Sequence, residues 1–284
     1  MNNYRFNEEI NEQTGKKNHL HQILRLDTGE WSNLTGTSGV MDVLAKPLTW
    51  WASGLAVSTL GWTKAEDWRK LKTDALKEAD LERRIKFTTP AFEMIKGMSI
   101  QDYIELLDQA YKAHSVKLDK SADAGTDLHE ILEHYVKGHM QGKEIIEDKK
   151  IKPFVEWTKK NVKRFIGSET HCYSGTLWIG GITDAVAELK NGEIAIIDFK
   201  SAKDAYDSHF FQIAGYDLQI IENGGFDAKG NQIFKLEKPI TQHIVVPFGA
   251  KEPYPVVSRL VEDNKEAFRS ALTLYRIKSK LSKE

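Results

Sequence analysis

The chain has 284 residues with 40 % hydrophobic content, which is enough to bury an ordinary core without disulfide or metal staples. Its 40 basic and 41 acidic residues give a formal charge of −1, which excludes a polybasic protein that binds nucleic acid through bulk charge. The single cysteine, Cys172, excludes an internal disulfide and a four-cysteine zinc or iron–sulfur site within one chain.

Targeting signals are also missing from the pattern. The first residues contain no apolar signal-peptide core, and the apolar run over 47–62 is shorter than the ~20 residues that a membrane span needs. We therefore expect a cytoplasmic protein without a membrane partner.

Helical patterns dominate our expectation for the first 120 residues. Hydroxyl residues at 35–38 suit a helix N-cap before apolar residues at helical spacing, and a second helix begins at Pro47. The segment 99–115 repeats this pattern, with Ser99 as its cap. We expect residues 1–120 to form a helical region that packs on a core at 121–284.

The core begins with two predicted helices, at 121–138 and from about 152 to 165. The period then changes to two, and Gly-Gly and Asn-Gly separate segments that are rich in β-branched and aromatic residues. These segments predict a meander of three antiparallel strands, at 170–180, 182–189 and 193–199.

A helix at 207–225, a strand at 238–248 and a helix from about 258 to 281 complete the pattern. The order of elements predicts an α/β or α+β class with one central mixed sheet flanked by helices.

In the predicted hairpin "ITDAVAELKNGEIAIIDFK", the charged residues Asp184, Asp198 and Lys200 occupy strand positions where apolar residues are usual. Asp198 and Lys200 are two positions apart, so they project from the same face of a strand. A two-residue loop would place Asp184 opposite Phe199, on the wrong face. A three-residue loop with a left-handed Gly192 places Asp184 opposite Asp198, and we favour that register.

Two carboxylates held across a strand pair repel each other, so a positive charge should accompany them. An ion pair with Lys200 at an exposed sheet edge is one explanation. A hard divalent cation is another, because Mg²⁺ and Mn²⁺ favour carboxylate oxygens. A metal on paired carboxylates beside an ammonium group suits the hydrolysis of phosphate esters, with Lys200 orienting the attacking water.

Four sequence elements occur in an order that resembles the PD-(D/E)XK nuclease superfamily, in particular its RecB-like exonuclease branch of phage and mitochondrial type. They are G-x-x-x-H at 125–129, G-x-x-D at 181–184, D-x-K at 198–200 and Q-x-x-x-Y at 212–216. The resemblance covers roughly residues 120–222, and more loosely 35–52. It implies a restriction-endonuclease-like fold.

The resemblance also implies roles for individual residues. Asp184, Asp198 and His129 would be metal ligands, the backbone carbonyl of Phe199 a further ligand, and Lys200 the catalytic lysine.

Three more residues would support this centre. Gln212 and Tyr216 would lie on a helix that faces the site, touching DNA or groups behind the ligands, and Glu169 would add an acidic group near the metal. Thr183 replaces the proline of the motif's name.

The implied activity is that of a divalent-metal-dependent DNA exonuclease with one or two Mg²⁺ or Mn²⁺ ions and no iron–sulfur cluster. Its partners would be single-stranded DNA or duplex ends, and a recombination or replication protein, in a bacterial or phage-infected cell. Two alternatives stay open. One is a nuclease-fold protein that binds DNA or assembles a complex with little turnover, and the other is a structure-specific endonuclease that cuts flaps or nicks.

Overall fold

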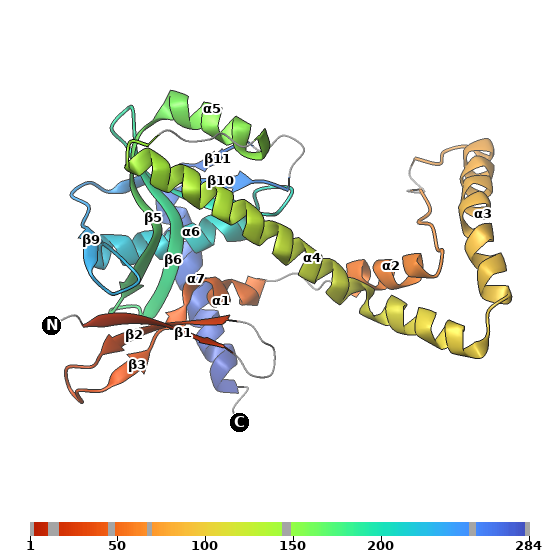
Figure 1. The fold of residues 1–284 in the computed structure, drawn as a ribbon, viewed down its shortest axis with the longest axis horizontal. Coiled ribbons are helices and arrows are strands. Elements are labelled where there is room, and N and C mark those ends of the chain that lie inside the picture. Colours follow the sequence, from red (N-terminus) through yellow and green to blue (C-terminus); the bar gives the residue numbers. More distant parts are fainter. Residues whose placement is uncertain are drawn as a thin grey trace. The chain divides into compact units, whose positions relative to one another are not determined.

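The computed structural model describes residues 3–10, 17–44, 49–66, 70–143, 149–249 and 254–281 (Figure 1). As predicted, the fold is mixed α/β, with a mixed sheet flanked by helices. The chain divides into a larger unit, residues 1–45 with 125–284, and a smaller unit, 46–124. The expected boundary at residue 120 therefore changes, because the first 45 residues join the core. In the described ranges, no helix is long and apolar enough to cross a membrane.

The N-terminal segment is stranded, so the prediction of helices there is wrong. Its strands are β1 (Tyr4–Ile10), β2 (Lys17–Leu24), β3 (Trp31–Asn33) and β4 (Thr35–Gly36). In the antiparallel β1–β2 pair, the buried Tyr4 hydroxyl and His21 Nδ1 are hydrogen-bonded at 2.6 Å. In β2 a histidine, His21, takes a buried position of this alternation, which hides the strand from an apolar pattern. The short helices α1 (Thr37–Val40) and η1 (Met41–Leu44) follow.

The central sheet has the strand order β11-β10-β7-β6-β5-β8-β9. Its strands are β5 (Val162–Ser174), β6 (Ile179–Leu189), β7 (Ile194–Lys200), β8 (Gly225–Phe226), β9 (Gln232–Phe234), β10 (Ile240–Pro247) and β11 (Val256–Ser258). Strand β10 is parallel to β7 and β4 is parallel to β6, whereas the other strand pairs described in this sheet are antiparallel.

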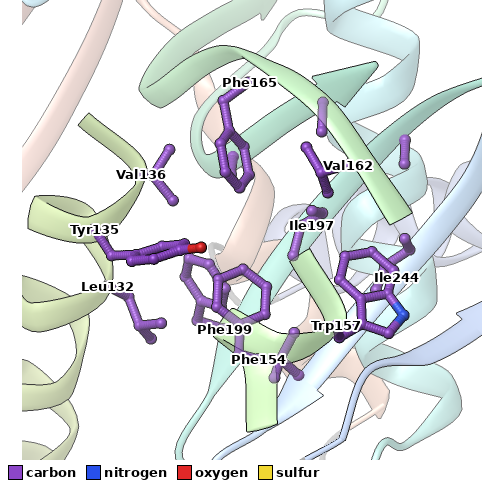
Figure 2. Close-up of a cluster of buried hydrophobic side chains, with 14 of the residues drawn as sticks. Leu132, Tyr135, Val136, Phe154, Trp157, Val162, Phe165, Ile197, Phe199 and Ile244 are labelled. Carbon is purple, nitrogen blue, oxygen red and sulfur yellow. The ribbon is translucent and has the colours of Figure 1, made fainter. Parts of the chain in front are cut away.

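Helices cover both faces of this sheet. On one face, apolar residues of α4 (Ile100–Met140) and α5 (Lys152–Asn161) pack against β5, β6 and β7 (Figure 2). On the other face, Ile213 and Ile220 of α6 (Asp207–Asn223) pack against Val186 and Ile196. Each fully buried side chain of this size contributes roughly 1.5–3 kcal/mol. The two clusters hold the middle of the sheet between helices.

Two predicted boundaries on the α4 and α5 side are corrected. The helices expected at 99–115 and 121–138 form the single helix α4. The helix expected to reach residue 165 ends at Asn161, and β5 begins at Val162. Phe165 is buried in the core as a residue of β5, and this packing favours a strand over a longer helix.

A buried charge network fastens the C-terminal helix α7 (Val261–Leu281) to the core. The fully buried Asp217 lies 3.0 Å from His243 Nε2 on β10 and 3.2 Å from Lys265 Nζ on α7. Asn264 of the same helix contacts His243 Nδ1 at 3.2 Å. Removing one partner of such a group is costly, because an uncompensated charge stays buried.

The smaller unit contains α2 (Thr49–Thr59), α3 (Asp74–Lys96) and the first part of α4. The short η2 (Lys149–Ile151) belongs to the larger unit. Thr73 caps α3 by accepting a hydrogen bond from the backbone of Leu76. Within the smaller unit, Asp80 accepts a hydrogen bond from the Arg83 side chain at 2.6 Å, which links neighbouring positions on α3. Arg84 adds a bond to the carbonyl of Thr63.

The β6–β7 hairpin has the predicted register. Its pairs run from Glu188–Ile194 to Ala185–Ile197, and the N–H of Leu189 donates to the Glu193 carbonyl at 2.8 Å. Gly192 has a φ of +83°, which closes the three-residue loop and is a conformation that glycine adopts at little cost. The observed pairs end there, and Asp184 and Asp198 are the next residues of the two strands in this register.

Thr37 joins the N-terminal segment to β6 and α6. Its buried hydroxyl donates to the Gly180 carbonyl at 3.0 Å and accepts from Gln219 Nε2 at 2.7 Å. Gly181 has no room for a side chain, because a Cβ there would lie 2.6 Å from the ring of Tyr216. The glycine of the G-x-x-D element is thus required by packing.

Substituting Gly181→Ala should destabilise the protein by about 1–3 kcal/mol, because the added methyl group overpacks the contact with Tyr216 and Thr37. Gly39→Ala is the matched control, since a Cβ at that helical position meets nothing within 4 Å. Chemical denaturation of the two variants measures the difference. Equal midpoints would contradict the close approach.

Candidate metal centre

Asp184 and Asp198 meet where the β6–β7 ladder ends. Beyond the last pair, Ala185–Ile197, the N–H of Phe199 donates to Asp184 Oδ2 at 2.5 Å. The carboxylate therefore takes the place of a strand carbonyl. Asp198 lies on the face of β7 that packs against α6, and it is 2 % exposed.

Glu169 lies on the opposite side of Asp184, on β5. The pairs Ser168–Ala185 and Thr170–Thr183 flank it, so the register places Glu169 across from Asp184. Glu169, Asp184 and Asp198 thus form a row of carboxylates across three neighbouring strands. We refer to these three residues as the carboxylate row.

The backbone of Glu169 is left-handed, with a φ of 46°, which is uncommon for a residue that is not glycine. In a regular strand, residues three apart lie on opposite faces. Here a Cβ on Gly167 would lie 2.3 Å from the hydroxyl of Thr170, so these two residues share a face. Glu169 therefore breaks the alternation of β5, and Glu133 and Lys137 of α4 act on its charge.

His129 completes a compact group of donors from the α4 side. Its Nδ1 lies 4.0 Å from Asp184 Oδ1. Ligand atoms of His129, Glu169 and Asp184 all lie within 4.8 Å of one another. Two ligands on opposite sides of an octahedral ion are ~4.2 Å apart, so a small closure of the group would fit one ion.

Lys200 lies at the end of β7 and balances the charge of Asp198. Its Nζ is 2.8 Å from the buried Oδ2 of Asp198, so the two side chains form a close ion pair. Burial alone would lower the pKa of Lys200, but the charges of Asp198 and Asp184 outweigh it and the net shift is upward. Lys200 therefore stays an ammonium group.

Burial and mutual repulsion raise the pKa values of the acidic groups. The pKa of Asp184 is raised by burial first and then by the charge of Asp198, against the opposing effects of His129 and Lys200. The pKa of Glu169 rises from 4.5 to about 8, again through burial and then through Asp184. The charges of the row are thus only partly balanced by the protein itself.

The donor set fits a hard divalent cation. It offers carboxylate oxygens and one imidazole, which suit Mg²⁺ and, because of the imidazole, Mn²⁺. Burial and mutual repulsion raise the pKa values of Asp184 and Glu169, and an added positive charge would relieve this repulsion. Asp184, Glu169 and His129 would hold such an ion, with Asp198 beside them.

The residues of the Q-x-x-x-Y element lie behind the row. Tyr216 is 4 % exposed, and its hydroxyl accepts from Gln212 Nε2 at 2.7 Å. Burial and the charge of Asp198 raise the pKa of Tyr216 well above its usual range. Gln219, the next polar residue on this side of α6, is fully buried. The side of α6 that carries Tyr216 and Gln219 is therefore not exposed to solvent. For Tyr216, a contact with groups behind the proposed metal ligands fits better than a contact with DNA.

One group near the row has no assigned role in the sequence reasoning. His209 is half-buried on the first turn of α6, and the charges of Lys200 and Asp198 act on it. Its spacing to Gln212 and Tyr216 at i+3 and i+7 is the signal that could have indicated it.

Glu169→Gln should stabilise the metal-free protein at pH 8–9 but not at pH 5. The folded protein holds the Glu169 proton up to a pKa of about 8, against 4.5 ordinarily. The stability from this proton is complete below about pH 4.5 and is lost as pH rises through 8. We expect a gain on the order of 2 kcal/mol, after allowance for solvent screening.

Urea denaturation of wild type and Glu169→Gln at both pH values measures this gain, with the exposed Glu237→Gln as control. A gain of equal size at pH 5 would show that removal of charge is not the cause.

Divalent metal should raise the melting temperature of the wild type. An ion at 100 times its dissociation constant stabilises a folded state by about 2.7 kcal/mol. Asp184→Asn should lose most of this shift, because Asp184 lies in the middle of the row. Thermal melts in chelator, Mg²⁺ and Mn²⁺ measure it, and an undiminished shift in Asp184→Asn would place the ion elsewhere.

Comparison with known proteins finds no relative of this chain. No protein-family model matches it, and a search of curated proteins finds no match. The carboxylate row, with His129 and Lys200 around it, is therefore the feature of the structure that indicates a function.

Proposed function

We propose that the protein is a divalent-metal-dependent DNA exonuclease of the PD-(D/E)XK, RecB-like type. The observation that carries the proposal is the carboxylate row, with Lys200 2.8 Å from Asp198 and His129 4.0 Å from Asp184. A structural ion pair at a sheet edge explains less, because β7 lies between β6 and β10 and Asp198 is buried.

The row supplies the negative charge that holds one or two Mg²⁺ or Mn²⁺ ions. When bound, such a cation polarises a phosphate and lowers the pKa of a water molecule. Asp184, Glu169 and His129 face this position together, and the N–H of Phe199 fixes the carboxylate of Asp184. The carbonyl of Phe199 remains a proposed further ligand.

Lys200 has the role of orienting the attacking water and offsetting charge on the phosphate in the transition state. Its pKa is raised by Asp198 and Asp184, so it donates hydrogen bonds at neutral pH and does not serve as a base. Asp198 keeps the ammonium group next to the row. Gln212 and Tyr216 support this arrangement from α6, through the hydrogen bond that joins them.

The biological setting follows as part of the same proposal. The substrate is single-stranded DNA or a duplex end, in the cytoplasm of a bacterial or phage-infected cell, in recombination, repair or replication. A partner protein of that process is expected. No iron–sulfur cluster is expected, because the one cysteine, Cys172, is buried in the sheet.

End-labelled DNA tests the proposal directly. Wild type should degrade it with Mg²⁺ or Mn²⁺, and Lys200→Ala and Asp184→Ala should each lose about 10²–10⁴-fold in rate. Lys203→Ala, an exposed lysine three residues on, is the matched control. Parallel 5′ and 3′ labels report the polarity of degradation.

Full activity in both variants would exclude the row as the catalytic centre. Circular single-stranded DNA separates the nuclease classes, because an exonuclease leaves it intact whereas an endonuclease cuts it. Retention of DNA without cleavage in either metal would favour a DNA-binding or assembly protein.

A further inference from the structure

His209 shares a face of α6 with the residues that support the candidate site. At 3.6 residues per turn, positions 209 and 216 differ by about 20° around the helix and by about 10 Å along it. Tyr216 lies against Gly181, three residues before Asp184. His209 is therefore at the end of the same face, and the loop 201–206 joins it to Lys200.

The hydrogen bond of His209 fixes its tautomer. The backbone N–H of Tyr206 donates to Nδ1 at 3.3 Å, so Nδ1 is the acceptor and the ring proton is on Nε2. The ring of Tyr206 meets the imidazole edge to face, with centroids 5.3 Å apart. Two contacts thus hold the ring, and within the described residues Nε2 makes no hydrogen bond.

The surroundings keep this donor uncharged. Burial lowers the pKa of His209, the charge of Lys200 lowers it further, and Asp198 opposes both. His209 is thus a neutral N–H donor next to an ammonium group that already serves Asp198. Phosphate oxygens accept hydrogen bonds from such side chains, and these contacts set the register of a nucleic acid strand.

We propose that His209 is a substrate-binding residue whose Nε2–H donates to a non-bridging oxygen of a DNA phosphate bound beside Lys200. This inference rests on the proposed function, since it takes DNA as the substrate. It adds a neutral contact from α6 to the charged groups of β6 and β7. Its effect should be on binding of the strand, with the chemistry of the row unchanged.

Three substitutions distinguish the proposed donor, Nε2, from Nδ1, which accepts the backbone N–H of Tyr206 at the start of α6. His209→Asn keeps an acceptor at the place of Nδ1 but loses the reach of Nε2, whereas His209→Gln keeps a donor near Nε2. His209→Glu has the size of Gln but presents a carboxylate to the phosphate. His134→Asn is the control, because His134 is exposed and, among the residues that the structure describes, bonds only the Glu130 carbonyl of its own helix.

Affinity is measured by fluorescence anisotropy with a labelled DNA end in chelator, and cleavage by kcat and KM in Mn²⁺. We expect His209→Asn to bind about tenfold more weakly, with KM raised to match, kcat within about twofold and the melting temperature unchanged. His209→Gln should recover most of the affinity, and His209→Glu should bind more weakly than His209→Gln by at least tenfold.

Equal affinity in wild type and His209→Asn, or equal affinity in the Gln and Glu variants, would overturn the proposal. The Gln and Glu pair decides the matter if the Asn variant does not fold. Wild type that binds DNA but does not cut it would overturn the proposed nuclease function alone, because the affinity series still tests His209. Wild type that does not bind DNA would overturn both.

Discussion

Repulsion between neighbouring carboxylates is the constraint to which the rest of this centre responds. Glu169, Asp184 and Asp198 stand side by side on β5, β6 and β7, where like charges destabilise a sheet. The protein answers with Lys200, with His129 and with the N–H of Phe199. These groups balance the row incompletely, as the raised pKa values of Asp184 and Glu169 indicate. Such an imbalance is more typical of a functional site than of a structural ion pair.

Because the backbone of Glu169 is left-handed, the carboxylate row faces both layers of helices. This conformation turns β5 so that Glu169 meets α4, while Asp198 stays on the side of α6. Strain of this kind persists only where the surroundings fix it, and it concentrates at functional sites. The twisted strand lets groups from both layers of helices reach one centre. Asp184, in the middle, is the residue that both sides share.

Local rules were sufficient for part of this arrangement. The Asn-Gly turn and the apolar pattern set the β6–β7 register, so the pairing of Asp184 with Asp198 could be predicted from the sequence. The spacing of Asp198 and Lys200 placed them on one face. The order of strands and helices predicted the mixed sheet with helices on its faces.

Long-range packing decided what the local rules could not. Glutamate has no preference for a left-handed backbone, so the sequence does not predict the break in the alternation of β5 at Glu169. The burial of Tyr216 and Gln219 could not be predicted, because it depends on Gly181 and Thr37, which are far away in the sequence. The N-terminal strands were missed for a different reason. Their alternation is carried by polar residues, such as His21, that become buried through partners.

The hydrogen bond from Thr37 to the Gly180 carbonyl has a consequence for the order of assembly. It joins residues 143 positions apart, whereas the β6–β7 hairpin closes through a turn of three residues. The entropy of closing a loop makes such distant contacts slow to form compared with a hairpin. The ribosome makes strands β1–β4 before β6 and α6. These strands can therefore dock only after β6 and α6 have been made. The carboxylate row can form before the segment that packs behind it.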